Sequence, residues 1–182
     1  MKKNSEPQIP AKVIKNRRVN LLTRRVYISL LLRVLFIALV GYLLLSQVFI
    51  IAQASGNGMF PALKDGDLLI GFRMQDVYLQ NDVILCKVNG ERVTGRIVAR
   101  GGDVVGLDES GQLYVNGSPQ GGEIMYPSYA KDGIEYPYKL PEKTFFIMGD
   151  YRTRAIDSRD FGPVPLEDVE GKLISILRRR GI

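Results

Sequence analysis

The segment DVILCKVNGERVTGRIVAR (residues 82–100) contains two runs typical of strands, Val83–Val88 and Arg92–Val98, with the pair Asn89-Gly90 between them. Both residues of this pair tolerate a positive φ, which two-residue hairpin turns require. The runs are rich in Val and Ile, residues that favour pleated strands. The segment therefore predicts a β-hairpin.

The same pattern continues on both sides of this hairpin. Further turn pairs occur at Gly66-Asp67, Gly102-Asp103, Asn116-Gly117 and Gly149-Asp150. Strands are predicted at Leu68–Phe72, Gln112–Val115 and Thr144–Met148, whereas the Tyr- and Pro-rich stretch Gly121–Pro141 is predicted to be a surface loop. Many short strands joined by tight turns favour a mainly β fold, an antiparallel barrel or sandwich.

An apolar segment precedes this domain. Residues 34–52 form a run of nineteen residues without a formal charge, close to the length needed to cross a bilayer as a helix. Residues 1–33 contain nine Lys and Arg and one acidic residue, a net charge of +8, whereas the rest of the chain has 16 basic and 18 acidic residues. Because the domain is mildly acidic, a basic face for nucleic acid is not expected.

Lys and Arg beside a span stay on the cytosolic side of the membrane. We therefore expect a cytosolic basic tail over residues 1–33, a single transmembrane helix over 34–53 and an extracytoplasmic domain over 54–182, at the cell membrane. The basic tail could also contact anionic lipid head groups. A cleaved secretory signal is the alternative, because Ala52-Gln53-Ala54 resembles a cleavage site.

The use of Cys and His limits the chemistry. The chain has one cysteine, Cys86, and no histidine, so neither an intrachain disulfide nor a Ser-His-Asp or Cys-His arrangement is possible. Cys86 falls within a predicted strand and is expected to be a buried core thiol. No metal or cofactor is expected, and a hydrolase would have to use Ser or Thr with Lys, or paired carboxylates.

Three segments resemble the type I signal peptidase family (S26-like), in the family's order behind a single span. They are GNGMFPAL (56–63), GRIVARGGD (95–103) and GDYRTRAIDSRDFG (149–162). In the family the first carries the serine nucleophile before Met-x-Pro, the second carries the lysine base, and the third carries a supporting serine. The resemblance implies a signal peptidase I-like β domain behind one N-terminal transmembrane helix.

The family's chemical positions are degenerate here. Gly58 takes the place of the serine, Gly95 that of the lysine, and Ala155 that of the supporting serine, so no catalytic residue is predicted. A serine nucleophile needs a hydroxyl and a base to take its proton, and glycine supplies neither. The family's cleft and buttress residues are retained, and they are Met59, Pro61, Arg96, Asp157, Ser158 and Arg159. Met59, Phe60 and Pro61 are expected to form an apolar lip at the membrane surface.

The resemblance implies a catalytically inactive signal peptidase I homologue, a pseudoenzyme. Members lacking the Ser-Lys pair resemble chaperone-like accessory proteins of Gram-positive pilus assembly, so the expected partners are the lipid bilayer, extended segments of secreted or surface proteins, in particular pilin subunits, and a sortase. The alternative is an active membrane-bound endopeptidase with a relocated nucleophile. The residues available for it are Ser55, Lys64, Lys87 and Ser158.

Overall fold

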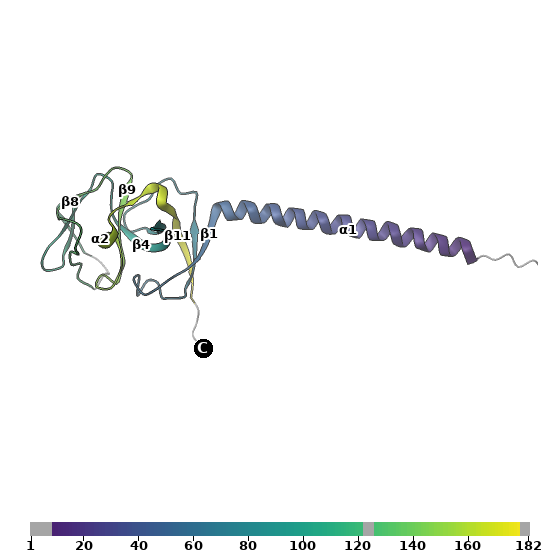
Figure 1. Cartoon of the computed structure of the whole chain (residues 1–182), viewed down its shortest axis with the longest axis horizontal. Helices are drawn as coiled ribbons and strands as arrows, with labels where there is room; N and C mark the ends of the chain where they lie inside the picture. Colours follow the sequence, from purple (N-terminus) through teal and green to yellow (C-terminus); the bar gives the residue numbers. More distant parts are fainter. Residues whose placement is uncertain (1–8, 122–125, 179–182) are drawn as a thin grey trace, which may run out of the picture. The chain divides into compact units, whose positions relative to one another are not determined.

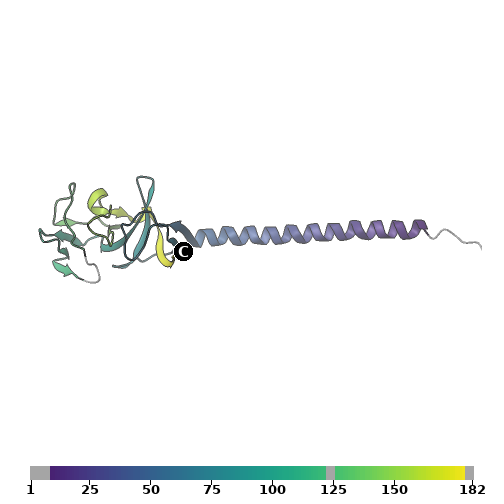
Figure 2. The ribbon, with the colours of Figure 1, turned by 90° about the horizontal axis from the view of Figure 1, so that it is seen from below.

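The computed structural model describes residues 9–121 and 126–178. The chain divides into two compact units, residues 1–46 and 47–182. Helix α1 (Ile9–Val48) makes up the described part of the first unit and is unbroken (Figure 2). Its segment Thr23–Val48 has a mean hydropathy of 2.5 in its most apolar window and is long enough to cross a membrane.

The helix ends five residues before the expected end of the span. Residues Phe49–Gln53 form strand β1, in which Ile50 and Ala52 are buried while Phe49, Ile51 and Gln53 are not. This two-residue period is that of a strand, and β1 pairs antiparallel with β2 (Leu68–Phe72). The expected transmembrane helix over 34–53 was therefore wrong in its last five residues, because cross-strand pairing overrides their apolar character.

The second unit contains two antiparallel sheets, as the mainly β prediction requires. The larger has the order β1-β2-β11-β3-β4-β9-β10. Its remaining strands are β3 (Val83–Val88), β4 (Glu91–Arg100), β9 (Thr144–Met148), β10 (Val164–Pro165) and β11 (Val169–Leu177). Figure 1 shows β4, β9 and β11 within this unit.

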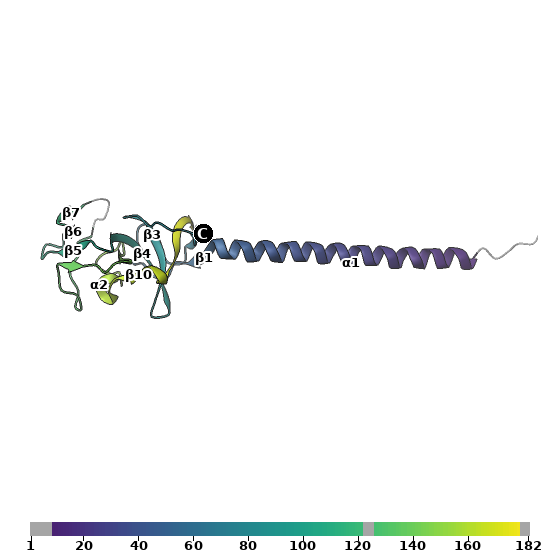
Figure 3. The same ribbon diagram turned by 90° about the horizontal axis from the view of Figure 1, so that it is seen from above.

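The smaller sheet has the order β7-β6-β5-β8. Its strands are β5 (Val104–Leu107), β6 (Leu113–Val115), β7 (Ser118–Gln120) and β8 (Tyr138–Lys139). Figure 3 shows β5, β6 and β7 together at one end of the unit. Two short helices, α2 (Ser158–Phe161) and the 3-10 helix η1 (Leu166–Asp168), complete the described elements.

The predicted hairpin is confirmed, with β3 and β4 paired from Val83↔Arg96 to Val88↔Glu91 and a positive φ at both turn residues. The predicted strands at 68–72 and 144–148 are also confirmed, and β6 begins one residue later than predicted. The predicted loop 121–141 contains β8, whose two residues pair with Val104 and Val105. Residues 122–125 of that loop lie outside the described part.

Cys86 lies on β3 inside a buried apolar cluster with Ile84, Ile97 and Ile147. Its side chain is fully buried, and burial, with smaller effects from Asp168 and Glu170, raises the pKa of the thiol from 9.0 to about 12. Only the thiolate is strongly nucleophilic, so this cysteine is a packing residue in the folded chain.

We expect Cys86 to resist thiol reagents at pH 8 until the domain unfolds, since the raised pKa and the burial both suppress attack. Because the pKa is higher in the folded than in the unfolded state, the associated stability is present below about pH 9 and is lost as the pH rises through about 12. Labelling with 5,5′-dithiobis(2-nitrobenzoate), with and without denaturant, measures this. Rapid labelling of the folded chain at pH 8 would contradict it.

Candidate functional site around Gly58, Ala155 and Asp157

Gly58 and Ala155, which stand at two of the degenerate positions, lie in contact. Gly58 is in the turn that follows β1, and a Cβ placed on it would lie 3.5 Å from the Ala155 Cβ. The Gly58 carbonyl accepts a hydrogen bond of 2.9 Å from the Tyr151 amide. The first and third segments are therefore joined at this point, and a small side chain at position 58 would fit.

Gly95 has a different environment. It lies on β4 opposite Ile84, and a Cβ placed on it would lie 2.9 Å from Cδ1 and 3.1 Å from Cβ of Ile147 on β9. Position 95 is buried, and its nearest neighbour is the Ile147 side chain rather than Gly58 or Ala155. A Cβ here would require Ile147 to move by a few tenths of an ångström, so position 95 is packed directly against an apolar side chain.

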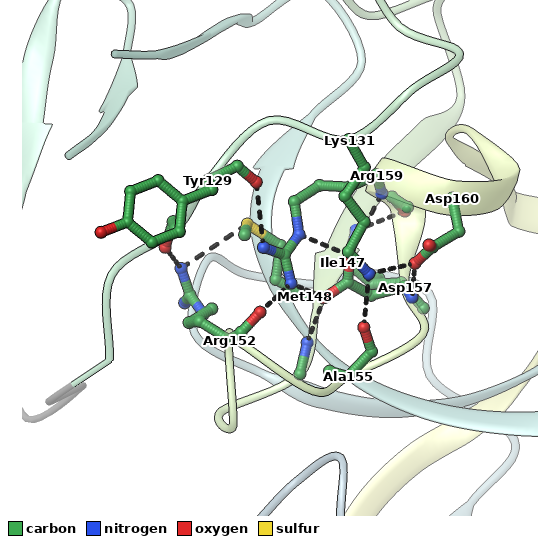
Figure 4. Close-up of polar contacts among 12 residues, drawn as sticks. Tyr129, Lys131, Ile147, Met148, Arg152, Ala155, Asp157, Arg159 and Asp160 are labelled. Carbon is green, nitrogen blue, oxygen red and sulfur yellow. Dashed lines mark hydrogen bonds and ion pairs between the residues drawn. The ribbon is translucent and has the colours of Figure 1, made fainter. Parts of the chain in front are cut away.

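The retained pair Asp157 and Arg159 forms a buried ion pair (Figure 4). Asp157 Oδ2 accepts a hydrogen bond of 2.7 Å from Arg159 Nη2, and Oδ1 accepts one of 2.9 Å from Nε. Both residues are about 1% exposed. This two-point contact holds the two side chains in one geometry, unlike a surface ion pair.

The same pair connects several backbone segments. Asp157 Oδ2 also accepts from the Gly149 amide at 3.1 Å, and Arg159 donates to the carbonyls of Arg152 at 2.6 Å and Tyr129 at 3.2 Å. The Ser158 hydroxyl accepts from the Ile147 amide at 3.0 Å and is fully buried. Asp157, Ser158 and Arg159 therefore brace the strand end that carries Gly149.

Arg96 forms a second two-point ion pair. Its Nε and Nη2 donate to the two carboxylate oxygens of Asp150 at 2.8 and 2.7 Å, and its Nη1 donates to the Asn81 carbonyl at 2.9 Å. Arg96 is thus fixed against the residue that follows Gly149. The sequence placed Arg96 beside the empty lysine position but did not identify Asp150 as its partner.

The expected apolar lip is wrong for Met59. Its side chain is only 5% exposed and packs in a core cluster with Ala52, Ala54 and Leu63. Pro61 is exposed and Phe60 is partly exposed. Met59 is buried because the turn after β1 places its side chain in one cluster with Ala52 of β1 and Leu69 of β2.

The candidates for relocated chemistry do not form a pair. Ser55, Lys64 and Lys87 are exposed, and the buried Ser158 hydroxyl is bound to the backbone. A lysine that the sequence did not single out, Lys131, does reach the site. Its Nζ donates to the Ala155 carbonyl and to Asp160 Oδ2, each at 2.6 Å (Figure 4). Its amine is thus held by an ion pair with Asp160 and by the Ala155 carbonyl.

Sequence reasoning missed Ile147, Lys131 and Arg152. Ile147 belongs to a recognised strand, but its contact with Gly95 depends on the register of β4 with β9. Lys131 lies in the stretch predicted as a loop, for which no sequence signal places the side chain. Arg152 belongs to the third segment of the resemblance, but the sequence does not indicate that its side chain is buried, at 3% exposed.

Comparison with known proteins gives the family. The model described as "Signal peptidase, peptidase S26" matches residues 27–177. Signal peptidase I V of Bacillus subtilis (strain 168) is 26% identical over 143 residues, covering 69% of this chain and 84% of that protein. Inactive signal peptidase IA of Staphylococcus aureus (strain Mu50 / ATCC 700699) is 27% identical over 157 residues, covering 80% and 86%.

Among solved structures, a signal peptidase I from Enterococcus faecalis V583 aligns with a TM-score of 0.46 and 29% identity, covering 54% of this chain and 98% of that one. The similar proteins thus include one named as inactive beside others named as peptidases. The family model spans most of the chain, including all three segments that carry the sequence resemblance. The chain therefore belongs to the signal peptidase family, peptidase S26.

Proposed function

We propose that this chain is a catalytically inactive member of the signal peptidase family that binds extended segments of secreted proteins. The observation that carries this proposal is the pair Gly58 and Gly95, which places no hydroxyl and no amine where the family has its nucleophile and base. Gly95 is also packed against Ile147, and Lys131 is held by Asp160. The braced framework of Asp157 and Arg159 nevertheless remains.

An open strand edge supports a binding role. The first half of β4, Glu91–Gly95, pairs with β3 on one side, whereas β9 pairs only with Arg96–Arg100 on the other. Among the described residues, no strand pairs with the second side of 91–95. Such an edge can take up an extended peptide through backbone hydrogen bonds, with side chains read by nearby surfaces.

The span and the distribution of charges support the proposed location. Segment Thr23–Val48 serves as the anchor, and the excess of Lys and Arg in residues 1–33 favours a cytosolic N-terminus with the β unit outside. The bound segments would then belong to proteins at the outer face of the membrane. From the resemblance to family members that lack the Ser-Lys pair, we propose pilin subunits as the clients and a sortase as the enzyme that acts next.

Site-specific photo-crosslinking tests this function in membranes that contain the full chain and a pilin precursor. A photoreactive residue replaces Thr94, within the open edge, or Asn57, beside Gly58. The matched control is the exposed Glu167 in η1. We expect pilin crosslinks from positions 94 and 57, none from 167, and no shortened pilin. Equal crosslinking at all three positions would contradict a specific site.

A further inference from the structure

A polar cavity of about 410 Å³ lies beside the site, and neither Gly58, Gly95 nor Ala155 lines it. Its lining includes Gln80, Gln112, Gln120, Tyr126, Ser128 and Arg152. A cavity of this size can hold a side chain of a bound peptide. Among the described residues that line it, Arg152 is the charged one, and no acidic side chain faces it.

Arg152 is buried without a carboxylate partner. Its Nη1 donates to Ser128 Oγ at 2.9 Å and contacts Met148 Sδ at 3.5 Å (Figure 4). Its Nε has no hydrogen-bond partner among the described residues, and no ion pair joins it to an acid in that part of the chain. The side chain is 3% exposed.

The two carboxylates that act electrostatically on Arg152 already have other ion-pair partners. Asp157 is paired with Arg159, and Asp150 is paired with Arg96, each at 2.7 Å. Within the part of the chain that the structure describes, these three guanidinium groups lie with two carboxylates, and Arg152 is the one that no carboxylate contacts. Burial lowers the pKa of Arg152 to about 10, so the side chain is still protonated at neutral pH.

A buried charge without a partner is unfavourable, and a charged donor left without an acceptor adds to this penalty. An anion entering the cavity that Arg152 lines would supply the missing counter-charge. A carboxylate matches a guanidinium better than other groups available on a peptide.

Aromatic side chains link the cavity to the site. The Tyr126 ring, in the cavity wall, lies 4.5 Å from the Tyr151 ring, and the Tyr151 ring lies 6.3 Å from that of Phe60. The Tyr151 amide is bound to the Gly58 carbonyl. These contacts connect the backbone at Gly58 with the wall of the cavity.

We propose that this cavity is a subsite for a carboxylate of the bound segment, held by Arg152. The subsite rests on the proposed binding function and gives it a specificity: segments carrying an acidic side chain, or ending in a free carboxylate, are preferred. Tyr126 and Tyr151 connect this cavity with Gly58, so the subsite and the Gly58 region can contact one bound segment.

Peptide titrations of the full chain in nanodiscs test the subsite. The probes are an acetylated and amidated alanine pentapeptide with a central glutamate, its glutamine counterpart, and an acetylated alanine peptide with a free C-terminus. The readouts are the dissociation constant and the ¹⁵N–¹H resonance of the Arg152 Nε–H, assigned by its loss in Arg152→Lys. The exposed Arg154→Gln serves as the matched control.

We expect the glutamate peptide to have a dissociation constant about ten-fold lower than that of the glutamine peptide, or lower still, and to shift the Nε–H resonance. Arg152→Lys should reduce this preference, whereas Arg154→Gln should keep it. Because the glutamate and glutamine peptides are compared on the wild-type chain, their affinity ratio tests the subsite even if Arg152→Lys does not fold. If only the peptide with a free C-terminus shifts the Nε–H resonance, the subsite binds the terminal carboxylate of a segment and not an acidic side chain.

Equal affinity for the glutamate and glutamine peptides, with no resonance shift, would overturn the subsite and leave the binding of extended segments intact. Failure of all three peptides to bind would also overturn it, and the crosslinks from positions 94 and 57 would then decide the proposed function separately.

Discussion

Asp157→Asn is expected to lower the free energy of unfolding of the β unit by about 3–5 kcal/mol, because it leaves the buried Arg159 without its counter-charge. It also weakens the acceptor for the Gly149 amide. Thermal unfolding of the full chain in mild detergent, followed by near-ultraviolet circular dichroism, should show a midpoint lower by about 10–20 °C.

Glu170→Gln is the matched control for this loss. Glu170 is paired with Arg92, whose side chain is 41% exposed, and such surface pairs contribute about 0–1 kcal/mol. If the two variants lose the same stability, the Asp157–Arg159 pair does not brace the site.

Gly149→Ala is expected to lower the free energy of unfolding by about 3 kcal/mol or more, at or above the upper end of ordinary overpacking. The added Cβ would lie 2.3 Å from the Ala155 Cβ and 2.5 Å from the Gly58 carbonyl oxygen. The oxygen belongs to the backbone and cannot rotate away. The variant should therefore separate Gly58 from Ala155 and also lose the crosslinks from position 57.

Gly58→Ala is the control for Gly149→Ala, since its Cβ would make only an ordinary contact at 3.5 Å. It should change the unfolding midpoint little. A Gly149→Ala variant as stable as Gly58→Ala would show that the backbones at 58 and 149 do not approach as closely as described.

The sequence predicted those strands and turns whose characteristic residues all lie within one short segment. The 82–100 hairpin has its turn residues and both strands within one short segment, and the strands at 68–72 and 144–148 have clear apolar runs. Strand β1 was missed because Phe49–Gln53 is as apolar as the helix before it, and only its pairing with β2 distinguishes the two. Strand β8 has two residues and depends on β5 for its existence.

The same distinction applies to the site. The motif order indicated that Gly58, Gly95 and Ala155 belong together, but the contact of Gly58 with Ala155 and the packing of Gly95 against Ile147 depend on tertiary register. The excess charge at Arg152 could not be predicted either. It depends on which arginine each carboxylate binds. Asp157 binds Arg159 two residues along the chain, whereas Asp150 binds Arg96, which only the tertiary fold brings near.

The most direct test of the central claim is a cleavage assay with the full chain in nanodiscs and a preprotein that carries a signal peptide. We expect no product above the chain-free background, since loss of nucleophile and base lowers the rate by on the order of 10⁶. Reproducible cleavage that is abolished by Ser55→Ala, Lys64→Ala or Lys131→Ala, with the fold intact, would contradict an inactive protein and show that the catalytic pair lies elsewhere.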